Sequence, residues 1–407
     1  MGTHGHTTYN FDERFEFTGK AKTFSLVAIV VGIIAIAYGF MVNGAERTFA
    51  NLLLMGYYFT GVCAASACFM AIQYVAQAGW SSGLIRIPQA FASTLPIAAI
   101  ILIVIIAAGL FTHNLYHHWH HEGLTDPDSP HYDALIAGKS VFLNAPAFLA
   151  RQVIFLGTYS ILALTLAKFS YQEDLNGGLS SYRKSFKYSA LFLVIFGFTT
   201  PIWAFDTIMS LEAHWFSTMF GWYNFAAMWV SALCAITLTI ILLKRAGYIS
   251  WVNENHLHDL GKFIFGFSIF WTYVWFAQFI LIWYANMPEE TVYFYKRWEP
   301  EYKPWFWLSL IINFVCPLLV LVDRDAKRKE SIMLFMCILL LAGHWLDYYI
   351  MVMPGTVEDH RGFGITEIGT AIGFVGLCAF LMLSKLAKHP LAPKNHPFIE
   401  ESLHHQI

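Results

Sequence analysis

Charged residues are scarce in this sequence. Only 13% of the 407 residues are Asp, Glu, Lys or Arg, and 57% are hydrophobic. An ordinary soluble domain carries about 25% charged residues, so a chain of this length and composition cannot cover a water-exposed surface of the usual kind. The formal net charge is −2, and there is no Lys/Arg cluster with interleaved aromatic residues, which argues against nucleic acid as a partner. The composition predicts an integral membrane protein.

Cysteine motifs are also missing. The sequence contains no CxxC, no CxxCH haem-attachment site and no Cys/His spacing of the kind that binds zinc. We therefore expect no covalently bound haem c, no iron–sulfur cluster and no metal in this chain. The cysteines all lie in apolar stretches and are expected to be small buried hydrophobic residues: Cys63, Cys68, Cys234, Cys316, Cys337 and Cys378.

Apolar runs of bilayer length are abundant. A helix needs roughly 20 apolar residues to cross the hydrocarbon core, and prolines inside such runs predict kinks rather than breaks, here at Pro96, Pro201 and Pro317. The sequence predicts an all-α polytopic protein with a cytoplasmic tail at 1–22, a membrane domain at 23–385 and a second cytoplasmic tail at 386–407. Ten runs are expected to span the membrane: 23–42, 50–78, 88–113, 146–169, 187–209, 220–243, 260–287, 304–322, 332–353 and 366–385.

The Lys and Arg residues predict the orientation. With the residues inside helix ends set aside, seventeen lie on the side of the two termini and six on the other side, which places both termini in the cytoplasm. The long loops 114–145 and 288–303 then face outward. Their aromatic and charged residues suit docking of a partner or an interfacial aromatic belt. The second to fifth and the sixth to ninth helices are expected to form two up–down four-helix bundles, related as a parallel repeat.

Ionisable residues at membrane depth are few, and each is a candidate for function because its burial is costly. The segment LLLAGHWLDYYI places His344 near the midplane and Asp347 on the same helix face, one turn nearer the outside. A neighbouring carboxylate can shift an imidazole across physiological pH, so the pair can hold or pass a proton. A structural hydrogen bond between helices is the alternative.

Other polar residues can extend such a path. Asp206 lies in the outer turns of its helix, where Arg151 can form an ion pair with it. Further candidates are single polar residues that more often serve helix packing: Glu212, His214, Gln278, Tyr284 and Asn313. Haem b is not expected, because only His344 among the histidines lies deep in the membrane. A solvated, histidine-rich loop is favoured over a metal site for His113, His117, His118, His120 and His121.

Three segments carry a family resemblance: SVFLNAPAFLARQV at 140–153, AFDTIMSLEAHWFSTMFGWYNF at 204–225 and HDLGKFIFGFSIFWTYVWFAQFILIWYANMPEET at 258–291. The chain resembles the membrane subunits of bacterial alternative complex III, which are related to the NrfD/PsrC quinol-interacting proteins. The short polar N-terminus leading into GKAKTFSLVAIVVG is more similar to the ActF type than to its quinol-binding paralogue, ActC. The likeness covers nearly the whole chain.

The resemblance implies a respiratory complex of the bacterial inner membrane that oxidises menaquinol and reduces a cytochrome c or an oxygen reductase. This chain would be a non-catalytic, cofactor-free subunit that contributes a proton path and a scaffold. Haem c and iron–sulfur clusters would lie on partners: an iron–sulfur subunit, multihaem cytochrome c subunits and the paralogous ten-helix quinol-binding subunit, with a terminal oxygen reductase as a further possible partner.

Two alternatives to this reading stay open. Asp206 stands in the FD..MSL motif, whose aspartate in the paralogue lies at the quinol end, so a quinone bound by this chain itself is one alternative, though a disfavoured one. A secondary transporter is the other. Transporters commonly use interrupted helices at matched positions in both halves, and the prolines of this chain are not matched in that way.

Overall fold

A computed structural model describes residues 9–357 and 361–406. Within these residues the chain is all-α and has ten helices long and apolar enough to cross a membrane. This confirms the predicted fold class. The spans are α1 with its π-helical end (Gly19–Asn43), α2 (Ala45–Val75), α3 (Arg86–Phe111), α5 (Ala145–Asn176), α6 (Ser180–Thr207), α7 (Met219–Arg245), α8 (Glu254–Ala285), α10–α11 (Lys303–Val320), α12 (Glu330–Thr356) and α13 (Ile365–Leu386).

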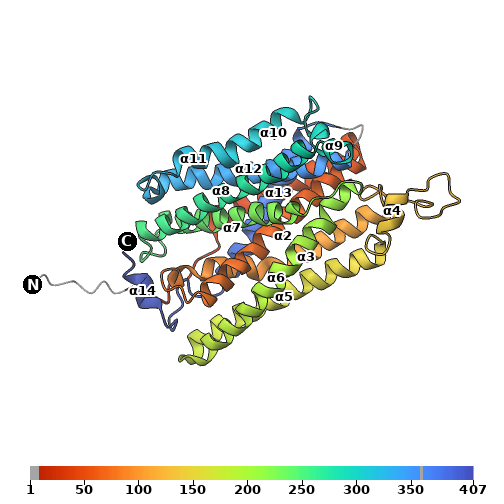
Figure 1. The fold of residues 1–407 in the computed structure, drawn as a ribbon. Helices are drawn as coiled ribbons and strands as arrows, with labels where there is room; N and C mark the ends of the chain where they lie inside the picture. The colour runs from red at the N-terminus through yellow and green to blue at the C-terminus, as the bar shows by residue number, and fades with distance from the viewer. Residues whose placement is uncertain (1–8, 358–360, 407) are drawn as a thin grey trace, which may run out of the picture.

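Two four-helix bundles make up most of the molecule (Figure 1). The first contains α2, α3, α5 and α6, and the second contains α7, α8, α10–α11 and α12. Helix α2 also packs against α7 and α12, so it joins the two bundles. The remaining spans, α1 and α13, pack against each other. Three short helices lie outside the membrane spans: α4 (Ala134–Lys139), α9 (Pro288–Arg297) and α14 (Ile399–Leu403).

Prolines lie inside α3, α6 and α12, and a π-helical turn interrupts the eighth span. Pro96 and Pro201 lie inside α3 and α6, which continue through them. The eighth span changes to a π-helix at Ile311–Val315 and resumes as α11, with Pro317 in its first turn. Wide turns of this kind are often found at functional sites, and this one brings Asn313 into the interior of the second bundle.

Helices α1 and α13 touch through glycines. A Cβ added to Gly32 would lie 2.3 Å from the Cα of Gly373, and one added to Gly369 would lie 2.3 Å from the Cβ of Ala35. In a bilayer, small residues at such crossings let helix backbones approach and gain packing contacts. The other side of α1 exposes large apolar residues such as Phe24 and Ile33, as expected of a face turned toward lipid.

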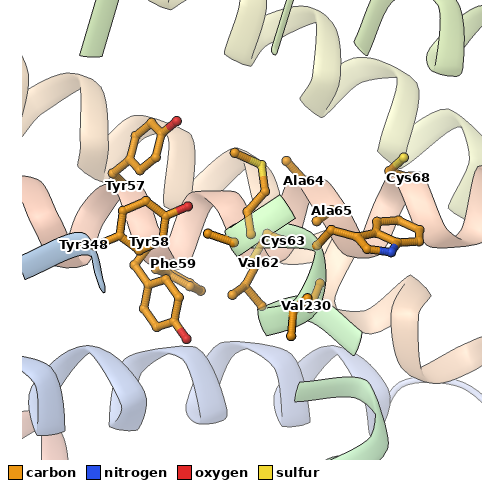
Figure 2. Close-up of a cluster of buried hydrophobic side chains, with 14 of the residues drawn as sticks. Tyr57, Tyr58, Phe59, Val62, Cys63, Ala64, Ala65, Cys68, Val230 and Tyr348 are labelled. Atoms are coloured by element: carbon orange, nitrogen blue, oxygen red, sulfur yellow. The ribbon is translucent and has the colours of Figure 1, made fainter. Parts of the chain in front are cut away.

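The centre of the hydrophobic core lies along α2, which is buried over nearly its whole length. Figure 2 shows Tyr57 and Tyr58 beside Tyr348 of α12. The ring centroids of Tyr58 and Tyr348 are 5.4 Å apart, and the Tyr58 hydroxyl donates to the Leu341 carbonyl at 2.9 Å. On its other side, the Tyr57 ring packs on Trp203 of α6 at 4.4 Å. Aromatic residues of α2 therefore contact both bundles.

Candidate functional site

The interior of the second bundle holds a buried carboxylate and a buried imidazole, both from α12. Asp347 accepts a hydrogen bond from the Tyr223 hydroxyl of α7 and another from Trp271 Nε1 of α8, the latter at 3.0 Å. His344 Nδ1 lies 3.9 Å from Asp347 Oδ2, which is too long for a hydrogen bond. Three helices thus converge on Asp347, and the imidazole stands next to it.

His344 is fully buried, and its ring packs edge-on against Trp271 with centroids 5.6 Å apart. Neither ring nitrogen has a hydrogen-bond partner among the residues that the structure describes. A buried polar group without a partner is costly, so a side chain of this kind in a membrane span is a candidate for function. A rearrangement of a few tenths of an ångström would bring the imidazole within hydrogen-bond distance of Asp347.

Two amide side chains predicted for this site also face the interior. Gln278 of α8 lines the same cavity as Asp347, and its Oε1 atom has no partner within the described ranges. Asn313 donates to Ser309 Oγ at 3.2 Å. Helix α12 approaches Asn313 closely, because a Cβ added to Gly343 would lie 2.3 Å from Asn313 Oδ1. The π-helical turn therefore places the Asn313 amide against Gly343 of α12, the residue that precedes His344.

A small cavity leads from Asp347 toward the outer face. Its volume is about 10 Å³, close to the room that one water molecule needs. Polar atoms line it at both ends, with Tyr223, Asp347 and Gln278 at the deep end and Arg297 of α9 at the outer end. Such a cavity can hold a bridging water between hydrogen-bonding groups.

The outer end of this cavity is closed by an ion pair. Arg297 Nη2 lies 2.6 Å from Glu212 Oε1, and Arg297 Nη1 donates to the Tyr293 carbonyl at 2.7 Å. The guanidinium also stacks on the Tyr293 ring at 3.2 Å. Although burial opposes the charge of Arg297, Glu212 and Tyr293 outweigh it and raise the pKa of the guanidinium. Glu212 is therefore joined to the second bundle.

The predicted pair of Arg151 and Asp206 is present, and it lies in the first bundle. Arg151 Nε and Nη2 contact Asp206 Oδ2 and Oδ1 at 2.7 and 2.9 Å. The guanidinium also donates to the Phe142 carbonyl at 2.9 Å and stacks on the Phe142 ring. Both carboxylate oxygens of the buried Asp206 are thus engaged by one bidentate cation. No observation here tests a quinone at Asp206, and it stays an alternative.

Two predicted residues lie apart from the buried group. The Tyr284 side chain is 85% exposed at the outer end of α8. His214 is largely exposed in the outer loops, where its Nε2 atom lies 2.6 Å from Asp133 Oδ2. This hydrogen bond holds the pKa of Asp133 below its usual value. Asp206, Glu212 and His214 therefore belong to three separate pairs.

The histidines of loop 112–144 pack mainly against each other. His113 stacks on His120 with centroids 5.3 Å apart, and His117 lies 4.1 Å from His118. In the described part of the chain, no group of three or more His, Cys, Asp or Glu residues is arranged to hold a metal ion.

Three residues of the site were not predicted from the sequence: Tyr223, Trp271 and Arg297. Tyr223 and Trp271 lie inside the segments 204–225 and 258–291 that carry the family resemblance. This resemblance was the signal in the sequence that could have pointed to them. Arg297 was counted only as an outer positive charge. A comparison with models of known protein families finds no match, and a comparison with characterised proteins finds none either.

Proposed function

We propose that this multi-pass membrane protein is a cofactor-free subunit of a menaquinol:electron-acceptor oxidoreductase of the alternative complex III type in the bacterial inner membrane. Its second bundle would provide a proton-transfer path, and its two bundles would provide the scaffold for redox subunits. The observation that carries the proposal is the buried pair of His344 and Asp347, in which the Asp347 carboxylate accepts hydrogen bonds from the neutral groups of Tyr223 and Trp271.

The chemistry of the pair supports proton transfer. Asp347 is stabilised as an acceptor by Tyr223 and Trp271, and the neighbouring imidazole can take up or give a proton without a large movement. When a proton passes from a protonated His344 to an ionised Asp347, the imidazole and the carboxyl group both become neutral. The transfer therefore creates no isolated charge. The cavity beyond Asp347 gives a one-water route toward the Arg297–Glu212 pair at the outer end.

The test uses the intact complex in proteoliposomes with His344→Leu and, separately, Asp347→Asn. Protons translocated per electron are expected to fall in both variants, because each removes one of the two groups proposed to pass the proton. Quinol oxidation by the partner subunits should continue in both variants. Tyr284→Phe is the matched control, because it removes a hydroxyl from an exposed side chain.

If proton translocation were unchanged in both variants while the complex assembled fully, His344 and Asp347 would be a packing contact and not a proton path. If only the His344→Leu complex failed to assemble, the Asp347→Asn complex would still test the proposal, because this substitution keeps the shape of the side chain.

The scaffold role rests on the outer face. Loop 112–144 exposes apolar side chains there, among them Leu135, Val141 and Phe142. An exposed apolar patch of this kind is typical of a surface that contacts protein or lipid. Affinity purification of the tagged chain in mild detergent should therefore bring iron–sulfur and multihaem cytochrome c proteins with it. Recovery of the chain alone or as a homo-oligomer would favour the transporter alternative.

A further inference from the structure

The C-terminal segment 389–406, which we call the C-terminal strap, crosses the cytoplasmic ends of both bundles. It follows α13 and includes α14 (Figure 1). Leu391 N donates to the Glu13 carbonyl at 2.9 Å, so the strap also holds the N-terminal segment. Leu391 and Ala392 are fully buried. The strap is therefore packed as part of the folded molecule.

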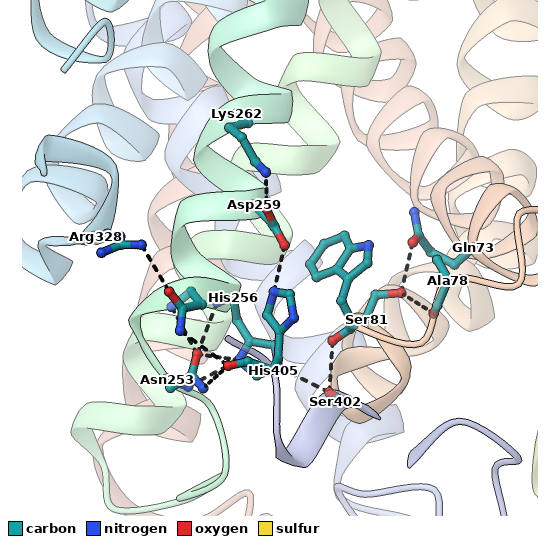
Figure 3. A network of polar contacts seen from close by, with 12 residues as sticks. Gln73, Ala78, Ser81, Asn253, His256, Asp259, Lys262, Arg328, Ser402 and His405 are labelled. Atoms are coloured by element: carbon teal, nitrogen blue, oxygen red, sulfur yellow. Dashed lines mark hydrogen bonds and ion pairs between the residues drawn. The ribbon is translucent and has the colours of Figure 1, made fainter. Parts of the chain in front are cut away.

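On the second bundle, the strap is fixed by His405. Its Nε2 atom lies 2.7 Å from Asp259 Oδ2, and its carbonyl accepts hydrogen bonds from the amides of Asn253 and Asn255 at 2.9 and 3.2 Å. These residues belong to α8 and to its N-terminal cap, as Figure 3 shows.

Between the bundles, Ser402 makes hydrogen bonds to both sides. Its hydroxyl donates to the Trp80 carbonyl at 2.8 Å and accepts from Gly83 N at 3.2 Å, both in the loop between α2 and α3. It also lies 3.1 Å from His256 Nε2 of α8. A single buried hydroxyl thus links the first bundle to the second through the strap.

On the first bundle, the strap packs against a group of polar and aromatic side chains. The His396 ring lies between Tyr74 of α2 and Tyr182 of α6, with centroids 5.9 and 5.5 Å away. Asn395 donates to the Asp174 carbonyl at 2.9 Å. His389 stacks on the Tyr171 ring at 3.4 Å.

A buried carboxyl group, Glu173, lies close to Tyr74 and Tyr182. Its residue is 1% exposed, and its Oε1 atom has no hydrogen-bond partner in the described part of the chain. The hydroxyls of Tyr74 and Tyr182 are likewise buried and unpartnered there. The nearby Arg86 is already engaged, since it pairs with Asp174 and donates to Gln89 Oε1 at 2.9 Å. One oxygen of the Glu173 carboxyl is thus excluded from water without a hydrogen-bond partner in the described part of the chain, which is costly unless the arrangement serves a purpose.

We propose that the C-terminal strap is a detachable cytoplasmic cover that controls access of water and protons to Glu173 in the first bundle. While it is docked, it also holds the two bundles in one relative arrangement through Ser402 and His405. This inference goes beyond the proposed function, because it concerns the other bundle and none of the groups around Asp347. Its test does not need proton translocation as a readout.

The experiment measures how fast Glu173 reacts with a water-soluble carbodiimide in the presence of glycine ethyl ester. The carbodiimide activates the carboxyl, the amine displaces it as a urea, and mass spectrometry detects the amide. The full complex is labelled in membrane fragments with an accessible cytoplasmic face. Glu16, which is exposed in the N-terminal segment on the same side, serves as the internal reference.

Two variants move the strap in opposite directions. Ser402→Ala combined with His405→Ala removes its buried hydrogen bonds and should increase labelling of Glu173 by about tenfold. Gly83→Cys combined with Ser402→Cys should pin the strap, since a Cβ at Gly83 would lie 2.8 Å from Ser402 Oγ, within reach of a disulfide. Labelling should then fall below the wild-type rate and recover upon reduction.

His404→Ala is the matched control, because its side chain is exposed and it leaves the buried contacts of the strap unchanged. Equal labelling of Glu173 in the loosened and the pinned variants would overturn the proposal. So would labelling of Glu173 in the wild type at the rate of Glu16. Both results are independent of whether His344 and Asp347 transfer protons.

Discussion

Two carboxylates of the second bundle are stabilised by different means. Glu212 is paired with the buried guanidinium of Arg297, whereas Asp347 accepts hydrogen bonds from the neutral groups of Tyr223 and Trp271. Adding a proton to Glu212 would leave Arg297 as a buried unpaired charge. Adding one to Asp347 would leave no such charge. Asp347 is therefore the carboxylate at which a proton can bind with the smaller structural penalty.

Arg297→Met is expected to destabilise the protein strongly. It leaves Glu212 buried without its cation, and breaking a buried ion pair in this way costs about 3–5 kcal/mol. The thermal unfolding midpoint in detergent should fall well below that of the wild type. Combining Arg297→Met with Glu212→Gln should recover part of the loss, because no unpaired charge remains.

Arg361→Met is the matched control for Arg297→Met. Its ion pair with Glu299 is about one-third exposed on both sides, so its loss should cost less than about 1 kcal/mol. Equal destabilisation by the two substitutions would show that the buried Arg297–Glu212 pair contributes no more to stability than the exposed Arg361–Glu299 pair.

The position of His344 and Asp347 within an apolar run was enough to predict them as candidate site residues. Position along the chain could not predict which residues contact the buried carboxylates. Tyr223 is separated from Asp347 by 124 positions and Arg297 from Glu212 by 85, so only the helix packing brings them together. The periodicity of the helix explains why Tyr284 does not face the interior although Gln278 does. Gln278 and Tyr284 are six residues apart, which turns them about 240° from each other on a helix. With Gln278 facing inward, Tyr284 has to face outward.

At the scale of whole helices, hydropathy predicted every span but not where the long ones end. Helices α5 and α8 each contain 32 residues, a length of about 48 Å against a hydrocarbon core of about 30 Å. Their polar ends on the side of the chain termini carry Glu173 and His256. The apolar run expected at 146–169 stops before Glu173, and for this reason the buried polar group around Glu173 was not predicted.

The contact between α1 and α13 depends on glycine. Gly32→Leu or Gly373→Leu would force the helices apart, because any Cβ at these positions overlaps the facing backbone. The expected cost is about 1–3 kcal/mol, as for other overpacked contacts, and α1 should become more accessible to added protease. Gly266→Leu is the matched control, since a Cβ there meets no atom within 4 Å. Wild-type stability of the Gly32 and Gly373 variants would contradict the importance of this crossing.

For the whole molecule, the strap and α2 have complementary roles. Helix α2 joins the bundles inside the membrane through apolar and aromatic packing and through the hydrogen bond from Tyr58 to the Leu341 carbonyl, and a change of pH has little effect on contacts of these kinds. The strap joins them at the end of the molecule where the chain termini lie, through side chains that can titrate. A change of pH on this side is therefore expected to act on the strap before it affects the membrane core.

Acidification should loosen the strap through His396. Its Nδ1 atom accepts a hydrogen bond from Phe398 N at 3.3 Å, which requires a neutral ring nitrogen. Burial, and secondarily the charge of Arg86, lower the pKa of His396 from 6.5 to about 4. The released strap then binds more protons than the docked one between these values. Docking is weakened as the pH falls from about 6.5 toward about 4, by at most about 3 kcal/mol.

A nitroxide attached at His404→Cys would report the release as increased mobility between about pH 7.5 and about pH 5. The other titratable groups around His396 are Tyr74 and Tyr182, which flank its ring, and Arg86, whose charge acts on it; Glu173 lies close to the two tyrosines. His389, stacked on Tyr171, also has a pKa lowered to about 4 by burial and by Arg86, Arg14 and Lys388, so it acts in the same direction. His396→Phe combined with His389→Phe should keep the rings packed and remove most of the pH dependence. If the label became equally mobile in this variant, the release would have to come from other groups, and the imidazoles would not be the sensors of the strap.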